Sequence, residues 1–212
     1  MLGVLFIAVF SFFLSGIFVP GLQSDEACDG LWAYYIINPH IPLKEIEEPT
    51  YFVTLFNRFF PVMANHPYIG AVESYLLVPF FLLFGVSVFS LRLMPVVISL
   101  VTVFLVYRLC KDWFGKKMAV MALLLTVTNL AFVMFSRVGL YREELFSIFF
   151  FWSGIFYFQK YITKQKIFYF CLGCFLFGLG ISAKIIFLWY IIGTIFACAI
   201  LGKIIFTHYK YP

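Results

Sequence analysis

Long apolar stretches separated by short polar segments make up most of this chain of 212 residues. Seven such stretches can be read from the sequence, at residues 2–19, 68–90, 93–107, 118–135, 145–158, 167–183 and 185–202. An α-helix needs a run of roughly 17–25 apolar residues to cross a hydrocarbon layer about 30 Å thick. The pattern therefore predicts an all-α protein, built as a polytopic bundle of transmembrane helices.

The first stretch has two interpretations, a cleaved signal peptide or a retained helix. A signal peptide begins with basic residues and ends in small residues at a cleavage site. This stretch has no basic start, and Pro20-Gly21-Leu22-Gln23 follows it. We therefore interpret it as a first transmembrane helix that stays in the protein.

Residues 20–67 interrupt the apolar pattern with carboxylates, prolines and many aromatic residues. Trp and Tyr are enriched where a membrane meets water. The segment therefore predicts a structured polar loop of short helices and turns at that interface.

The Lys and Arg residues decide between seven and six spans, because cytoplasmic loops carry an excess of them. Seven spans would place most of these residues outside. If residues 68–90 do not cross, the turns 108–117 and 159–166 and the C-terminal tail become cytoplasmic and hold most of the charge. Glu73 and Pro79 within 68–90 also favour an interfacial or re-entrant helix. We therefore predict six spans in a single membrane domain, with an outer segment 20–92, a helix bundle 93–202 and both termini cytoplasmic.

Composition supports a membrane protein, since 64% of residues are apolar, 12% are charged and the mean hydropathy is +1.01. A soluble domain carries roughly a quarter of charged residues. The net charge of +5 would suggest nucleic acid in a soluble protein, but here the basic residues lie between apolar runs, so membrane lipids are expected as partners and nucleic acid is not. Gly173, Gly178 and Gly180 share one stretch and predict close helix packing there. The scattered cysteines are interpreted as packing thiols, and no metal site is predicted.

Two polar clusters are predicted to face the same outer side. The first is Ser24-Asp25-Glu26-Ala27-Cys28-Asp29, and the second is Ser136-Arg137-Val138-Gly139-Leu140-Tyr141-Arg142-Glu143-Glu144, with His66 and Lys184 near the same face. Carboxylates there can act as a general base or hold a divalent cation, an option that the sequence leaves open. Arginines there can neutralise a phosphate.

Each of these residues also has a purely structural interpretation. The carboxylates can be solvated loop charges, and Arg137 and Arg142 can extend from helix ends towards water. His66, just before Pro67, can simply start a helix, and Lys184 can be the cation of a tight turn. The residues alone leave both interpretations open.

Several short motifs in order resemble the GT-C type membrane glycosyltransferases, in particular the protein O-mannosyltransferase and aminoarabinose-transferase-like group. They are Asp25-Glu26, His66-Pro67-Tyr68, Leu83-Phe84-Gly85, Ser90-Leu91-Arg92-Leu93-Met94-Pro95, Val106-Tyr107-Arg108-Leu109, Trp113-Phe114-Gly115, Phe135-Ser136-Arg137 and Gly178-Leu179-Gly180-Ile181-Ser182-Ala183-Lys184. The resemblance implies inverting transfer of a sugar from a polyprenyl-phosphate carrier, on the outer face of the plasma membrane or the luminal face of the endoplasmic reticulum.

The resemblance also implies roles for individual residues. Asp25 corresponds to the family's catalytic carboxylate, with Glu26 beside it, while Arg137 or Lys184 would bind the carrier phosphate. Arg142 stands where the family usually has an Asp, so Glu143 or Glu144 is expected to replace that Asp.

The length of the chain agrees with only the N-terminal half of such an enzyme, and a second membrane chain that completes the fold is therefore an expected partner. The alternative is a non-catalytic membrane protein that binds a polyprenyl lipid or scaffolds a partner. A transporter is less favoured, because no predicted span holds a buried charge pair or the broken helices expected of a carrier site.

Overall fold

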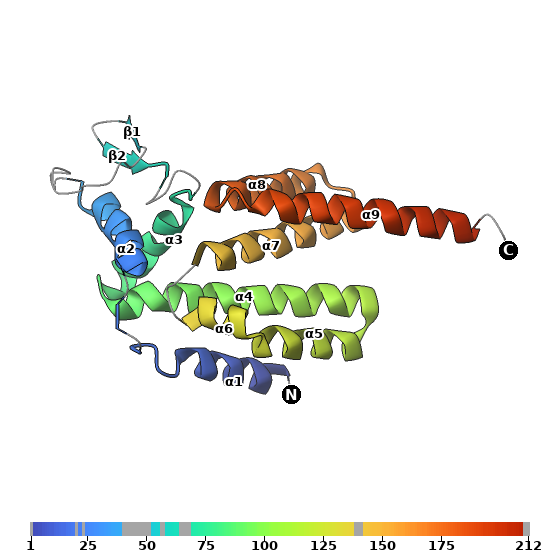
Figure 1. The fold of residues 1–212 in the computed structure, drawn as a ribbon, viewed down its shortest axis with the longest axis horizontal. Helices are drawn as coiled ribbons and strands as arrows, with labels where there is room; N and C mark the ends of the chain where they lie inside the picture. Colours follow the sequence, from blue (N-terminus) through green and yellow to red (C-terminus); the bar gives the residue numbers. More distant parts are fainter. Residues whose placement is uncertain are drawn as a thin grey trace.

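A computed structural model describes residues 2–19, 21–22, 24–39, 52–55, 58–63, 69–137 and 142–209 (Figure 1). The helices within these residues are α1 (Leu2–Leu14), α2 (Ser24–Ile37), α3 (Val72–Phe84), α4 (Val88–Phe114), α5 (Lys116–Thr128), α6 (Leu130–Arg137), α7 (Arg142–Lys164), α8 (Ile167–Ala183) and α9 (Phe187–Tyr209). Two short antiparallel strands, β1 (Phe52–Leu55) and β2 (Arg58–Pro61), form a hairpin.

Helix α4 is the centre of the fold (Figure 1). On one side it contacts α1, α5 and α6 around a core that includes Phe13, Val96 and Phe132, and on the other side α2, α3, α7, α8 and α9 enclose a second core around Met94 and Phe187. Helices α2 and α3 and the hairpin lie at one end of the bundle, whereas the α4–α5 and α7–α8 turns lie at the other end (Figure 1). The two ends of the bundle, along the axis of α4, are therefore built from different elements.

Helix α4 is also the strongest candidate for a membrane span. Its 27 residues extend over about 40 Å, longer than the hydrocarbon layer. Among the described residues it alone is long and apolar enough to cross by itself, and α5 with α6 qualifies as a second span only if that bent pair is counted as one. The helical architecture agrees with the predicted fold class, and the number of six spans stays a prediction.

The structure starts α4 five residues before the boundary predicted at residue 93. Ser87 caps the helix because its side chain accepts from the backbone N–H of Ser90, while the Ser90 hydroxyl accepts from the backbone N–H of Ser87. This reciprocal capping box satisfies N–H groups that have no partner within the helix. Arg92 therefore lies inside the helix rather than in the outer segment.

The apolar stretch 118–135, predicted as one span, is broken at Asn129. Helices α5 and α6 meet there at an angle of 63°. The Asn129 side-chain oxygen accepts from the backbone N–H of Phe132 at 3.0 Å and so starts α6 as a new helix. An Asn that caps a new helix favours a break over continuation. The stretch therefore holds two helices, and its crossing of the membrane as one span stays a prediction.

Two further elements differ from the sequence-based expectation. Helix α1 ends at Leu14 rather than near Val19, and Gly16 follows it with a φ of 69°. The loop expected to contain only helices and turns also holds the β1–β2 hairpin, where Phe52 pairs with Pro61 and Val53 with Phe60. Neither helical periodicity nor hydropathy indicates which residues pair across these two strands.

Close contact between α8 and its neighbours depends on glycine. A Cβ added at Gly173 would lie 2.7 Å from the ring of Phe158, and one at Gly180 would lie 2.4 Å from the ring of Phe187. Nothing lies within 4 Å of such an atom at Gly178. The predicted packing role of Gly173 and Gly180 is confirmed, and Gly178 faces open space.

Gly180→Ala should therefore destabilise the bundle. Phe187 is completely buried and its ring cannot move away. We therefore expect the free energy of unfolding to fall by about 1–3 kcal/mol, a loss typical of overpacking. The matched control is Gly178→Ala on the same helix, which should be neutral or stabilising by up to about 1 kcal/mol. Unfolding in detergent micelles measures both, and equal effects of the two substitutions would contradict the assigned packing.

Candidate functional site

Helix α2 begins the candidate site, because Asp25 is its second residue and Glu26 its third. Glu26 is completely buried, and its two carboxylate oxygens accept hydrogen bonds from Arg92 Nε at 2.7 Å and Arg92 Nη2 at 2.8 Å. Such a two-point pair is among the strongest and most directional interactions of a carboxylate. In this structure Glu26 thus anchors the start of α2 to α4. The side chain of Asp25 is not among those that the structure describes.

Arg92 also holds the segment that leads into α2. Its Nη1 donates to the carbonyl of Ile17 at 2.7 Å and its Nη2 to that of Gly21 at 3.1 Å. The sequence analysis used Arg92 in the count of basic residues and in a family motif, and it missed this structural role. The signal was available, because an ionised residue within an apolar helix needs a partner.

Arg137, predicted to bind a phosphate, contacts the same linker from α6. Its guanidinium donates to the carbonyl of Ser15 and lies 5.4 Å from the centre of the Phe12 ring. Arg92 and Arg137 thus hold the chain between α1 and α2 at the carbonyl groups of residues 15, 17 and 21. Substrate binding by Arg137 stays a prediction.

Three predicted residues do come together where α8 ends. The Lys184 ammonium lies 3.3 Å from Glu143 Oε1 and 2.5 Å from Glu144 Oε1, and these side chains are 12%, 14% and 25% exposed, respectively. Residues 69 and 184 also form an isolated β-bridge, and the Gly70 N–H donates to the carbonyl of Ala183. The cluster therefore joins the start of α7, the α8–α9 break and the chain before α3.

The protonation of Lys184 follows from its carboxylate neighbours. Burial disfavours the charged ammonium, but the hydrogen bond to Glu144 and the charges of Glu143 and Glu144 outweigh this effect and raise the pKa of Lys184 above its ordinary value. The cluster thus holds two carboxylates around one ammonium.

Two buried oxygen atoms on α7, one of them in this cluster, have no hydrogen-bond partner among the described residues. They are Glu144 Oε2 and the hydroxyl oxygen of Ser147, one turn further along α7. Buried polar atoms almost always have a partner, which can be a ligand hydroxyl or water. These two oxygen atoms therefore keep hydrogen-bonding capacity that the described side chains do not fill.

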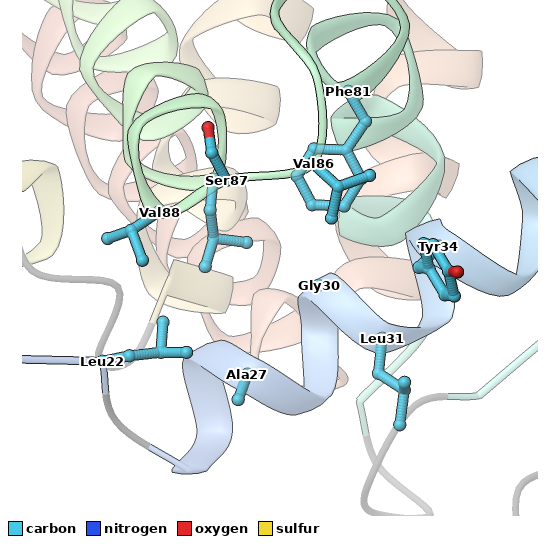
Figure 2. Close-up of a pocket in the computed structure, with 10 residues that line it drawn as sticks. Leu22, Ala27, Gly30, Leu31, Tyr34, Phe81, Val86, Ser87 and Val88 are labelled. Carbon is cyan, nitrogen blue, oxygen red and sulfur yellow. The ribbon is translucent and has the colours of Figure 1, made fainter.

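An apolar groove of about 390 Å³ runs beside the start of α2 (Figure 2). One wall is α2, and the other is the end of α3 with the α3–α4 turn; the lining residues are Leu22, Ala27, Gly30, Leu31, Tyr34, Phe81, Val86, Ser87, Val88 and Leu91. Ala27 and Leu91 directly adjoin Glu26 and Arg92 in sequence. The groove therefore opens next to the buried ion pair and suits a hydrocarbon chain.

Comparison with known families decides the class of the protein. Residues 65–211, more than half of the chain, match the family model described as dolichyl-phosphate-mannose-protein mannosyltransferase. The chain belongs to this family. Its members are membrane glycosyltransferases, and the resemblance seen in the sequence is thereby confirmed. Comparisons with curated proteins and with solved structures gave no match.

The mannosyltransferase match divides the predicted site residues into two groups. His66, Arg137, Arg142, Glu143, Glu144 and Lys184 lie within it, and Asp25 and Glu26 precede it. His66 and the Arg142 side chain lie outside the described residues. Within the part of the chain that is described, no three His, Cys, Asp or Glu side chains form a group that could hold a metal ion. A divalent cation at Asp25 stays an open option.

Lys184→Gln tests the importance of the ion pairs for the mannosyltransferase-like bundle. We expect a loss of about 1.5–3 kcal/mol, the range for hydrogen bonds to charged groups. Because the folded pKa of Lys184 is raised, its contribution is fully present below the ordinary value of 10.5 and is lost as pH rises through the folded pKa. The difference in free energy of unfolding between the wild-type protein and the Lys184→Gln variant should be constant from pH 7 to 9 and should decrease above about pH 10.5. A difference that grows with pH would contradict this pairing.

Proposed function

We propose that the chain transfers a sugar from a polyprenyl-phosphate carrier to an acceptor hydroxyl. The observation that carries this proposal is the family match over residues 65–211, which makes the chain a member of a membrane glycosyltransferase family. The apolar groove beside α2 and the polar cluster at Lys184 support it, because a lipid-linked sugar has both an apolar chain and polar hydroxyl and phosphate groups.

In the proposed reaction Asp25 accepts the proton of the acceptor hydroxyl. The acceptor oxygen then attacks the anomeric carbon, and the bond from that carbon to the phosphate oxygen breaks, so that polyprenyl phosphate leaves with the electron pair. The configuration at the anomeric carbon is inverted. Lys184 contributes positive charge to the leaving phosphate, while Glu143 and Glu144 orient its ammonium.

A second candidate function is non-catalytic binding of a polyprenyl lipid, or scaffolding of another membrane chain. A specific observation favours it. Two of the cations expected to bind a phosphate already have protein partners, Arg137 at the Ser15 carbonyl and Lys184 at two carboxylates. A phosphate would have to compete with these contacts.

A transfer assay separates the two candidates. The purified chain in lipid nanodiscs is incubated with polyprenyl-phosphate sugars, with hexosyl and pentosyl donors tested separately, and release of the sugar to a hydroxyl acceptor is measured together with carrier binding. Transfer supports the enzyme. Binding without transfer to any acceptor, with or without a co-encoded membrane chain, would favour the second candidate.

The side of transfer is proposed from the charge distribution. The α4–α5 and α7–α8 turns carry seven Lys and Arg residues, and the candidate site lies at the opposite end of the bundle (Figure 1). Single cysteines at Val53 and Lys164, introduced in a cysteine-free background, should be labelled from opposite sides of the membrane, with Val53→Cys reached from outside. Labelling of both from one side would contradict the proposed orientation.

A further inference from the structure

The α7–α8 turn carries a compact group of lysines and aromatic rings that the proposed transfer reaction does not use. Its members are Lys160 and Lys164 at the end of α7, Lys166 in the turn, Tyr157 on α7 and Tyr169 on α8; we call them the lysine–tyrosine cluster. The cluster lies at the end of the bundle far from α2 and α3 (Figure 1).

The rings position the ammonium groups. Lys160 Nζ lies 4.3 Å from the centre of the Phe156 ring, 5.3 Å from that of Tyr157 and 5.8 Å from that of Tyr169. Lys164 Nζ lies 5.7 Å from the same Tyr169 ring. Two ammonium groups one helical turn apart are thus gathered around one ring, and cation–π attraction holds each of them near it.

The backbone around these lysines is well braced. Gln165, with a φ of 52°, makes the tight turn, and its side chain donates to the carbonyl of Ile162 at 2.8 Å. The Thr163 hydroxyl donates to the carbonyls of Gln159 and Lys160. Tyr157 and Tyr169 stack across the two helices with ring centres 6.3 Å apart. A braced turn loses little conformational freedom when a ligand binds.

The charge of this region is unbalanced. Among the described residues no carboxylate forms an ion pair with Lys160, Lys164 or Lys166, and the other turn at this end adds four cations and one acid: Arg108, Lys111, Lys116, Lys117 and Asp112. Positive charge without internal compensation attracts an anion from outside the chain.

Exposed apolar residues adjoin these charges. Ile162, Ile167 and Phe168 are 69%, 66% and 65% exposed, respectively, and Trp113 and Phe114 are exposed beside the other basic turn. A surface that changes from apolar to cationic over one turn of helix matches the boundary between acyl chains and phosphate groups. An acidic soluble protein would match the charge but not the exposed apolar residues next to it.

From this geometry we propose that the lysine–tyrosine cluster binds the headgroup of an anionic phospholipid. The phosphate accepts charge-assisted hydrogen bonds from the Lys160 and Lys164 ammonium groups, and the acyl chains lie along the exposed apolar residues. The inference concerns the end opposite the candidate site and does not depend on the proposed sugar transfer.

The test compares two lipids of equal chain length, phosphatidylglycerol and phosphatidylcholine, titrated onto the purified chain in a neutral detergent. The anionic lipid should bind more tightly, and its advantage should decrease as salt is raised. K160Q/K164Q should weaken phosphatidylglycerol binding about 25-fold, since each cation near anionic lipid contributes about fivefold, and should leave phosphatidylcholine binding unchanged. The charge-preserving K160R/K164R should retain the preference.

The matched control is K111Q/K117Q, which removes the same charge from the other basic turn at the same end. This variant should keep most of the phosphatidylglycerol affinity, and retained helicity confirms that each variant is folded. Equal affinity of the wild-type chain for both lipids would overturn the proposal. Equal losses in the two double Gln variants would also overturn it, because the attraction would then belong to the whole basic end. Tighter binding of poly-glutamate than of phosphatidylglycerol would assign the surface to an acidic protein instead.

Discussion

Arg92→Gln is expected to lower the free energy of unfolding by about 3–5 kcal/mol. Arg92 and Glu26 are both completely buried, and removal of one partner leaves the other charge without compensation in an apolar interior. The substitution also removes donors to the carbonyls of Ile17 and Gly21, so the start of α2 should loosen first. Chemical unfolding in detergent micelles measures the loss, and hydrogen exchange measures opening of α2.

The control for this prediction removes both charges. A double variant, Glu26→Leu with Arg92→Met, should recover much of the loss, because replacing a buried ion pair by apolar side chains of similar volume is often neutral or stabilising. A single Arg92→Gln variant within about 1 kcal/mol of the wild-type protein would show that the pair does not anchor α2.

Asp25→Asn is expected to reduce sugar transfer by a factor of about 10²–10⁴, typical for loss of a general base. The amide has the size of the carboxylate but accepts no proton at neutral pH. Because Asn is also a good residue near a helix N-terminus, α2 should persist, and carrier binding should change little. Initial rates and carrier affinity, measured in the same nanodiscs, test both parts.

Asp112→Asn provides the matched control, since it also turns one Asp into Asn but at the opposite end of the bundle. Asp112 lies 3.4 Å from Arg108 in an exposed pair, and such pairs contribute little to stability. Its transfer rate should equal that of the wild-type chain. If Asp25→Asn were as active as Asp112→Asn, Asp25 would be a solvated charge at the start of α2.

Much of the helical architecture follows from the sequence alone. The apolar stretch 167–183 is α8 to the residue, whereas the turn predicted at 159–166 is shortened to Gln165 and Lys166, because α7 continues to Lys164. Hydropathy identifies such elements because the free energy gained by burying apolar side chains is roughly proportional to the buried area and does not depend on direction. The ordered motifs in the sequence also led to the correct family.

For the candidate site, the sequence predicted which residues lie near the same side of the membrane but not which of their side chains are in contact. The sequence pointed to Glu143, Glu144 and Lys184, and the structure places their charged groups in contact. It also indicated Glu26 as a site carboxylate, whereas in the structure this side chain is paired with Arg92 inside the core. Spacing along the chain cannot tell which carboxylate turns inward, because that choice depends on a partner 66 residues away.

Sequence by itself therefore determined the helical class, most helix positions, the asymmetric distribution of basic residues and the family. The folded structure was needed to locate the bend at Asn129 and the start of α4 at Val88, which local helix caps fix, and the β1–β2 hairpin and the pairing of Arg92 with Glu26. The features determined by the sequence depend on the hydrophobicity and charge of a segment, and these two properties do not depend on how the chain folds. The features that needed the folded structure depend on hydrogen bonds and ion pairs, which require particular atoms to lie within about 3 Å, and only the folded chain sets those distances.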